Sequence, residues 1–191
     1  MGTIKTTNIE PIADNGTVTL GSSGDTFTVP SGVTITNNGT QTGFGGANTP
    51  NFFAYVSSNY SVNSTTETTL PLNAELYDTA SAFNTSTYTF TVPSGQAGKY
   101  YLFGQIRKNN FSGSRTFFEI LRTPSGGSLG GIYIAENSGG SDGYISISGS
   151  TVISLSVGDA LQMKIYHNDS GSREFFGGFQ NSFFGGYKII E

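Results

Sequence analysis

The feature that most constrains this chain is an alternation of apolar and polar residues between Tyr88 and Tyr187, interrupted by turn residues. The alternation is clearest in YTFTVPSGQAGKYYLF, in SLSVGDALQMKIY and in SFFGGYKI. Side chains of a strand alternate between two faces, whereas an amphipathic helix repeats its apolar residues every three or four positions, and no window of this chain does so. We therefore expect an all-β sandwich with little or no helix.

Composition narrows the classes of function. Only 12 % of the 191 residues are charged, and the nine Lys and Arg residues are spread thinly over a chain of net charge −4. Nucleic-acid binding needs clustered basic side chains, so we do not expect it. The chain has no cysteine, which excludes disulfides and CxxC metal sites. No apolar run approaches the length of a membrane span, and MGTIKTTNIE lacks the regions of a secretory signal.

The sequence divides into two regions at QTGFGGANTP, whose Gly, Asn, Thr and Pro residues are typical of a linker. We predict a short β-rich N-terminal segment at 1–43, a linker at 44–50 and a sandwich head at 51–191. The N-terminal segment carries three alternating apolar pairs, Val18/Leu20, Phe27/Val29 and Val33/Ile35. About 40 residues rarely build an independent core. We therefore expect this segment to become stable by packing against copies of itself.

Within the head, turn signals separate ten strand-like runs, which is typical of a sandwich or jelly roll. These runs lie at 52–57, 70–77, 87–92, 99–107, 115–122, 131–136, 143–148, 151–157, 160–166 and 174–189. In KYYLFGQI, Tyr100, Leu102 and Ile106 fall on one face, while Tyr101 and Phe103 fall on the other. A sandwich strand needs only one apolar face. We therefore expect a partner subunit to cover the second apolar face.

Two short motifs occur twice. FTVPSG at 27–32 and 90–95 indicates one strand-then-turn solution used in both regions. FFGG at 175–178 and 183–186 sets bulky rings beside residues without side chains, which suits either a symmetry axis or ordinary core packing. From these patterns we predict an interface between copies of the chain that contains Tyr101, Phe103, Phe117, Phe176, Phe184 and Tyr187, and the resemblance given next implies that this is a trimer interface.

From Asn51 to Ile190 the order of motifs resembles the C1q/TNF-like globular head. The motifs are Phe52-Phe53-Ala54, then Phe83-Asn84 through Phe90, then Gly98, Tyr100 and Leu102, then Gly158-Asp159 with Leu161, and finally Ser182, Phe183, Gly185 and Tyr187. Leu102 stands where that family usually has an aromatic residue, and Phe184 stands where it usually has a serine. The resemblance implies a ten-stranded jelly roll that assembles as a homotrimer around a threefold axis.

The front of the chain, TIKTTNIEPIADNGTVTLGSSGDTFTVPSGVTITNNGTQTGFG, resembles the leading part of virion structural proteins of tailed phages from marine bacteria and cyanobacteria. Together the two resemblances imply a homotrimer on the surface of a virion, anchored to other virion proteins by its N-terminal segment. The first reading is a tail-fibre or spike component whose head contacts a host surface glycan or protein. The alternative is a capsid decoration, or cement, protein that stabilises the head shell.

Few residues suggest chemistry, and we expect no enzyme and no organic cofactor. The single histidine, His167, lies in YHNDSGSRE, which we interpret as a solvated polar loop rather than part of a catalytic triad. The carboxylates of Glu75 and Asp78 are interpreted as turn and surface groups. The resemblance to C1q-like heads, many of which bind calcium near the trimer apex, makes calcium the candidate ion. The oxygen-rich loops 136–143 and 167–174 offer Asp142 and Asp169 as its candidate ligands.

Overall fold

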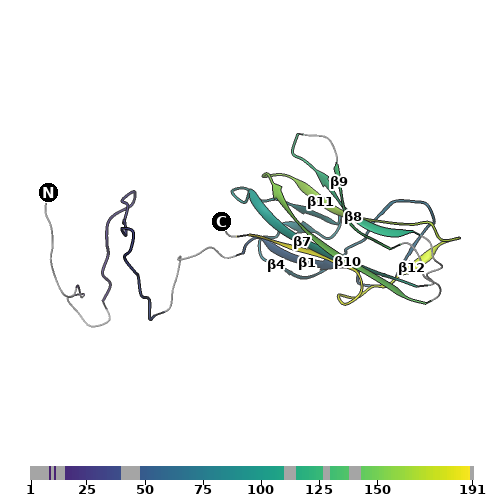
Figure 1. Cartoon of the computed structure of the whole chain (residues 1–191), viewed down its shortest axis with the longest axis horizontal. Coiled ribbons are helices and arrows are strands. Elements are labelled where there is room, and N and C mark those ends of the chain that lie inside the picture. Colours follow the sequence, from purple (N-terminus) through teal and green to yellow (C-terminus); the bar gives the residue numbers. More distant parts are fainter. Residues whose placement is uncertain are drawn as a thin grey trace. The chain divides into compact units, whose positions relative to one another are not determined.

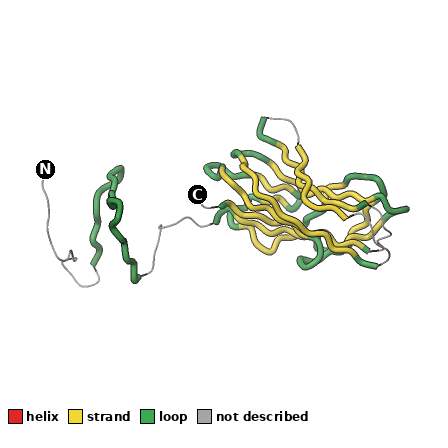
Figure 2. Tube along the Cα trace, in the orientation of Figure 1, coloured by secondary structure: helices red, strands yellow, loops and turns green. Residues whose placement is uncertain are grey.

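A computed structural model describes residues 9, 11, 16–39, 48–109, 115–126, 130–137 and 143–189. The chain separates into two compact units, Met1–Thr42 and Gly43–Glu191. All strands lie in the second unit, and the described residues contain no helix (Figures 1 and 2). Accordingly, the described part of the chain offers no helix that is long and apolar enough to cross a membrane. The all-β expectation is confirmed.

The head consists of two antiparallel sheets. Sheet A has the order β2-β12-β7-β13-β1-β4, with β10 on the free side of β7. Its strands are β1 (Asn51–Tyr55), β2 (Tyr60–Val62), β4 (Ala74–Asp78), β7 (Gly98–Lys108), β10 (Ile145–Leu155), β12 (Arg173–Phe175) and β13 (Phe183–Lys188). Sheet B has the order β5-β6-β11-β8-β9, with β3 on β11. Its strands are β3 (Thr68–Thr69), β5 (Phe83–Asn84), β6 (Thr89–Thr91), β8 (Thr116–Thr123), β9 (Gly130–Asn137) and β11 (Ala160–His167).

The strands differ from the predicted runs in three ways. The runs at 143–148 and 151–157 form the single strand β10, because Gly149 and Ser150 continue the pairing with β7. The run at 174–189 divides into β12 and β13. Short strands β2, β3 and β5 were not predicted, since two or three residues are too few to show an alternating pattern.

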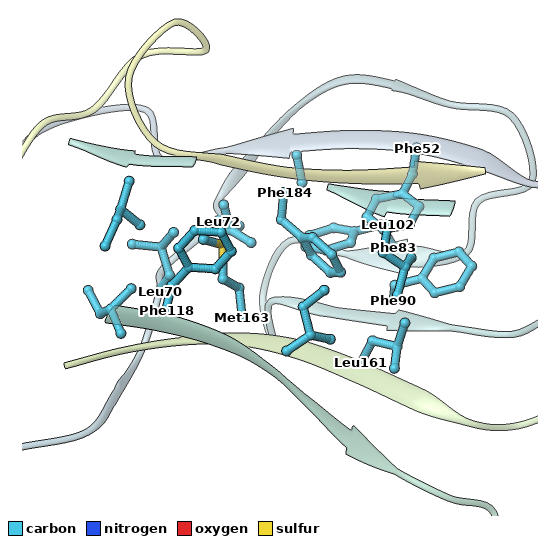
Figure 3. Packing of buried hydrophobic residues seen from close by; sticks show 14 of the residues in the cluster. Phe52, Leu70, Leu72, Phe83, Phe90, Leu102, Phe118, Leu161, Met163 and Phe184 are labelled. Carbon is cyan, nitrogen blue, oxygen red and sulfur yellow. The ribbon is translucent and has the colours of Figure 1, made fainter. Parts of the chain in front are cut away.

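The core lies between the two sheets and is rich in aromatic rings. Phe52 stacks on Phe90 with ring centroids 4.3 Å apart and meets Phe184 edge-on at 5.1 Å. Figure 3 shows Phe52 and Phe184 near the strands of one sheet, and Leu161, Met163 and Phe118 on the opposite side of the cluster. Such ring pairs add to the burial of large apolar areas, which is the main source of stability in a fold without disulfides.

The alternation along β7 is confirmed residue by residue. Tyr100, Leu102 and Ile106 are buried in the core, whereas Tyr101 and Phe103 lie on the outer face of sheet A and are only half-buried. The Tyr100 hydroxyl donates a hydrogen bond to the Gln96 carbonyl at 2.7 Å, so its polar end is satisfied inside the head. Burial raises the pKa of Tyr100 to about 12, which keeps this hydroxyl protonated.

The described part of the front segment, residues 16–39, contains no strand. The structure describes one copy of the chain, so the expected packing of this segment against other copies stays a prediction. Turns are present, since Asp25 N donates to Ser22 O at 3.0 Å and Val33 N donates to Pro30 O at 3.2 Å. All its described residues are exposed except Val29, which is partly exposed.

Candidate self-association surface

A cluster of six aromatic rings covers the outer face of sheet A, and we call it the aromatic face. Its members are Phe53, Tyr77, Tyr101, Phe103, Phe183 and Tyr187. They come from four adjacent strands, β1, β4, β7 and β13. Phe53 stacks on Phe183 at 4.9 Å between centroids, and Tyr101 lies 5.4 Å from Tyr187. None of the six is fully buried, and Tyr77 is 45 % exposed.

Strand register explains why the rings meet. Gly185 of β13 pairs with Phe53 on one side and with Phe103 on the other, so these two phenylalanines lie at one level across the sheet. Tyr187 pairs with Tyr101 two residues further along β13, and therefore on the same face. Directly opposed residues of an antiparallel pair bring their side chains together on one face. The doublets Phe52-Phe53 and Phe183-Phe184 place one ring on this face and one in the core.

The FFGG motif at 183–186 provides the space for the rings. A β-carbon on Gly185 would lie 2.5 Å from Cζ of Phe103, and one on Gly186 would lie 2.6 Å from Cδ2 of Leu102. Both approaches are shorter than van der Waals contact, so β13 is crossed by a ring on its outer side and by a leucine on its inner side. The motif thus serves the aromatic face and the core at once.

One end of the same face is polar. Beyond Phe103, β7 presents Gln105, whose Nε2 donates to the carbonyls of Gln180 and Asn181 at 3.0 and 3.1 Å. Arg107 follows, and its guanidinium carbon lies 5.4 Å from the centroid of Tyr144 and 5.6 Å from that of Phe176. Cations over ring faces are attracted by the ring quadrupole. The outer face of sheet A is therefore apolar and aromatic at one end, and basic and hydrogen-bonded at the other.

The structure brings three of the six predicted interface residues together. Tyr101, Phe103 and Tyr187 belong to the aromatic face. Phe176 lies at its polar end beside Arg107. The remaining two lie elsewhere, as described next.

Phe117 is on β8 of sheet B, where it stacks on Tyr166 at 5.0 Å and lies under the Arg115 guanidinium at 4.6 Å. Phe184 is fully buried in the core of its own chain and is not available to a partner. Phe184 is therefore a correction, because alternation tells which neighbours share a face but not which face is the inner one, whereas a role for Phe117 in an interface stays a prediction. Phe53, Tyr77 and Phe183 were missed for the same reason, although the FF doublets guarantee one outward ring each.

His167 is a correction. It is not in a solvated loop but is the last residue of β11, and its side chain is fully buried. Its Nε2 lies 3.0 Å from the Val62 carbonyl, which requires a proton on that nitrogen. Burial lowers the pKa of His167, and the charges of Lys108 and Arg173 lower it further, so the ring is neutral near pH 7. The sequence contained the signal, since the inward alternation Leu161, Met163, Ile165 continues to position 167.

Asp169 is part of a buried charge cluster rather than an open calcium ligand. Its carboxylate forms a close ion pair with the Lys108 ammonium, and both side chains are fully buried. His167 Nδ1 and Arg173 Nε lie 3.4 and 3.6 Å from the same oxygen, Oδ2. Two cations and a ring thus occupy the surroundings that a metal ion would need. The other candidate, Asp142, lies outside the described residues, and those residues contain no group of three or more metal-ligating side chains.

The acidic residues near β4 have distinct roles. Asp78 serves a turn, because its carboxylate accepts hydrogen bonds from the backbone N–H groups of Ala80 and Phe83 at 3.1 and 2.7 Å. Glu75 lines a shallow hollow of about 610 Å³ together with Phe83 and Asn84. Burial raises the pKa of Glu75 and the Asp78 charge raises it further, which sequence reasoning did not anticipate.

The fold is similar to that of several solved structures. Murine APRIL at pH 5.0 superposes with a TM-score of 0.57 at 16% sequence identity, over 73% of this chain and 99% of that chain. The globular domain of zebrafish complement 1qA gives 0.55 at 17% identity, over 73% and 97%. Eiger TNF from S. frugiperda gives 0.54 at 17% identity, over 73% and 93%. No protein-family model matches the chain, and no curated protein matches it in sequence. The head therefore has the C1q/TNF-like jelly-roll fold.

Proposed function

We propose that the chain is a homotrimeric structural and recognition module whose subunits meet through the aromatic face. The observation that carries this proposal is the cluster of six rings on the outer face of sheet A, which a single copy leaves partly open to water. Contiguous apolar patches of this kind are uncommon on monomers, and aromatic residues are enriched in the cores of interfaces. The C1q/TNF-like fold supports three copies as the state, because that family resemblance implies a homotrimer.

The polar end of the face would form the rim of the interface. Gln105, Asn181 and Arg107 are held in place by hydrogen bonds and ring contacts, so a partner meets a preorganised border. Rims of interfaces are polar and contribute more to orientation than to affinity. In a threefold assembly each copy uses two different patches, one toward each neighbour. The grading from rings to basic groups provides two such chemically distinct areas.

The place of action that we propose is the surface of a virion. The support is the resemblance of the front of the chain to the leading part of tailed-phage structural proteins. In this proposal the N-terminal segment joins the trimer to other virion proteins, and the head acts as a tail-fibre or spike component that contributes to host attachment. Its loops are rich in Tyr, Asn, Ser and Gly, which suit adaptable polar contacts with a host glycan or protein.

A capsid decoration protein is the second candidate, because the resemblance of the front of the chain to virion structural proteins fits a position on the capsid as well as one on the tail. A cement protein would use the same trimer at a local threefold position of the shell. We propose a non-enzymatic role in both cases, because Glu75 is the one carboxylate with a raised pKa in a described hollow, and neither a basic side chain nor a nucleophile bound to a base lines that hollow.

Light scattering on the full chain tests the trimer. We expect a particle of three 20.1 kDa chains at micromolar concentration. Phe53→Asp should release single folded chains, because it places a carboxylate among the rings. Tyr77→Asp, at a more exposed ring on an edge strand, provides a second variant if Phe53→Asp does not fold. Tyr166→Asp on the outer face of sheet B is the matched control and should remain trimeric. A monomeric native chain would refute the proposal, and dissociation by Tyr166→Asp alone would move the interface to sheet B.

The two virion roles are separated by labelled particles. An antibody against the head should mark the tail if the chain is a fibre or spike component, and the capsid if it is a cement protein. The number of copies per particle gives an independent answer, since a decoration protein is present in far more copies. Absence of the chain from purified particles would refute both roles while leaving the trimer untouched.

A further inference from the structure

The front segment, residues 16–39, has exposed apolar side chains and almost no charged ones. Five large apolar residues in it are exposed, namely Val18, Leu20, Phe27, Val33 and Ile35. Asp25 is its only charged residue, and that carboxylate accepts a hydrogen bond from Ser22 N at 2.7 Å within a turn. A segment of this composition gains from burial and has no charge to guide it to a strongly charged partner.

The hexapeptide FTVPSG occurs once in the front segment and once in the head, so the two copies can be compared. In the head, FTVPSG ends in a turn in which Gln96 N donates to Pro93 O at 3.1 Å, with Gly95 at φ 74°. In the front segment, Val33 N donates to Pro30 O at 3.2 Å, with Gly32 at φ 83°. A positive φ at the third position of such a turn favours glycine. The same six residues thus fold into the same turn twice.

The two copies of the motif differ in what covers them. Phe90 of the head copy lies in β6, which pairs with β5 and β11, and its side chain is 0 % exposed. The equivalent Phe27 is 70 % exposed, and the described residues around it form no ladder (Figure 2). The front copy therefore has the turn and the alternation of a paired strand, but it lacks the neighbouring strands.

We propose that the missing strands are the same segments of two other copies, so that residues 16–39 of three chains pair into a β-structured stalk. This inference rests on the proposed trimer. The segment is joined through residues 40–47 to Asn48 and then to β1, which carries Phe53 of the aromatic face. Three segments tethered to one trimeric head meet at a high effective concentration, and a weak mutual affinity then suffices.

Pairing of identical segments also satisfies the backbone. Residues 16–39 form two backbone hydrogen bonds within the described chain, and both close turns. Strand pairing with other copies would satisfy the remaining N–H and C=O groups and bury the apolar faces of the three alternating pairs together. Thr19, Thr28 and Thr34, one step out of phase with those pairs, would face water.

Hydrogen exchange and spin labelling of the full chain test the stalk. Amides 16–39 should exchange much more slowly than in an unstructured peptide. Because the chain has no cysteine, Thr28→Cys accepts a single nitroxide label. Labels of different chains should show one short, narrow distance that disappears when labelled chains are diluted with unlabelled ones. Ser86→Cys, in the turn after β5, is the control label and should give a different, longer distance.

A matched pair of variants completes the experiment. Val33→Asp should abolish the protection of residues 16–39 and broaden the Thr28→Cys distance, while light scattering still reports three chains. Thr34→Asp, which places the same charge one residue later, should retain the protection. A trimer whose residues 16–39 exchange at free-peptide rates would overturn the stalk and leave the proposed trimer standing. Protection with long interchain distances would also overturn it, because the segment would then dock on its own chain. A monomeric native chain would overturn both proposals.

Discussion

The ring of Phe103 lies across the backbone of Gly185, where a β-carbon would approach its Cζ to 2.5 Å and the Phe52 carbonyl oxygen to 3.0 Å. The neighbouring Gly186 faces the core, where a β-carbon would approach Leu102 Cδ2 to 2.6 Å. Two successive residues without side chains therefore support two different surfaces. One is the aromatic face and the other is the inside of the sandwich.

Alanine substitutions at these two positions should separate association from folding. Gly185→Ala should displace the Phe103 ring from its place on the outer face. The trimer should then dissociate at a higher protein concentration than the native trimer, while the single chain stays folded. Gly186→Ala should overpack the core and lower the free energy of unfolding by about 1–3 kcal/mol. Light scattering on dilution and urea unfolding measure the two effects. Equal effects of both variants on both measurements would contradict this division of roles.

The Gly158-Asp159 turn depends on a buried carboxylate. Asp159 is 1 % exposed and accepts hydrogen bonds from Ser156 N at 2.9 Å, Ser125 N at 3.1 Å and Arg122 Nη2 at 2.7 Å. Burial alone would raise its pKa, but these hydrogen bonds and the Arg122 charge outweigh it and lower the pKa. The stabilisation from this carboxylate is therefore present at neutral pH and is lost as the pH falls through its lowered pKa.

Asp159→Asn should lower the free energy of unfolding by about 1.5–3 kcal/mol, because an amide cannot accept all of these bonds and loses the charge that strengthens them. Urea unfolding at pH 7 measures the loss. The control is Glu136→Gln, which removes the exposed pair with Arg115 at 2.9 Å and should cost at most about 1 kcal/mol. Similar losses for the two variants would show that burial does not strengthen the Asp159 contacts.

The buried pair of Lys108 and Asp169 should be costly to break but replaceable as a whole. Asp169→Asn leaves the Lys108 ammonium buried without that carboxylate, and the free energy of unfolding should fall by about 3–5 kcal/mol. Replacing both residues by apolar side chains, Lys108→Met with Asp169→Leu, should cost less than Asp169→Asn alone. Urea unfolding of Lys108→Met, of Asp169→Leu and of the double variant gives the coupling between the two side chains. Additive losses would show that the two charges do not depend on each other.

Alternation within one strand predicts which side chains share a face, and this determines which features of the fold could be predicted from the sequence. The faces of β7 were predicted because Tyr100, Leu102 and Ile106 share one parity within a single strand, and the turns between strands were marked by Gly, Pro and Asp. The C1q/TNF-like fold was predicted from the order of motifs, and the structural neighbours confirm that fold, whereas the order of strands within each sheet was not predicted.

Strand pairing was not encoded in the same local way. Which ring of Phe183-Phe184 faces outward depends on the register with β1 and β7, and that register is set by residues far away in the sequence. The position of Phe117 on the opposite sheet was hidden for the same reason. The buried cluster around Asp169 was not predicted because a run of polar residues normally indicates a loop. The ion pair with Lys108, which offsets the desolvation of the carboxylate, is a tertiary contact that the local sequence does not show.

His167 should make the protein less stable as the solution becomes mildly acidic. Its pKa in the folded chain is lowered by burial from an ordinary value near 6.5, with Lys108 and Arg173 adding to the shift. Below pH 6.5 the unfolded chain therefore binds a proton that the folded chain does not, and stability falls with the pH until the lowered pKa is reached. Above pH 7 both states are neutral at this residue, so the effect vanishes.

Because His167 is the only histidine, its removal should be visible in the pH profile. The urea midpoint of the native chain should fall between pH 7 and pH 5, and His167→Gln should flatten that fall even if its midpoint at pH 7 is lower. The groups that face the ring are Asp169, Lys108 and Arg173, with the Val62 carbonyl on Nε2. A midpoint that rises on acidification would mean that a protonated ring pairs with the Asp169 carboxylate 3.4 Å from Nδ1, and that this attraction exceeds the cost of burial.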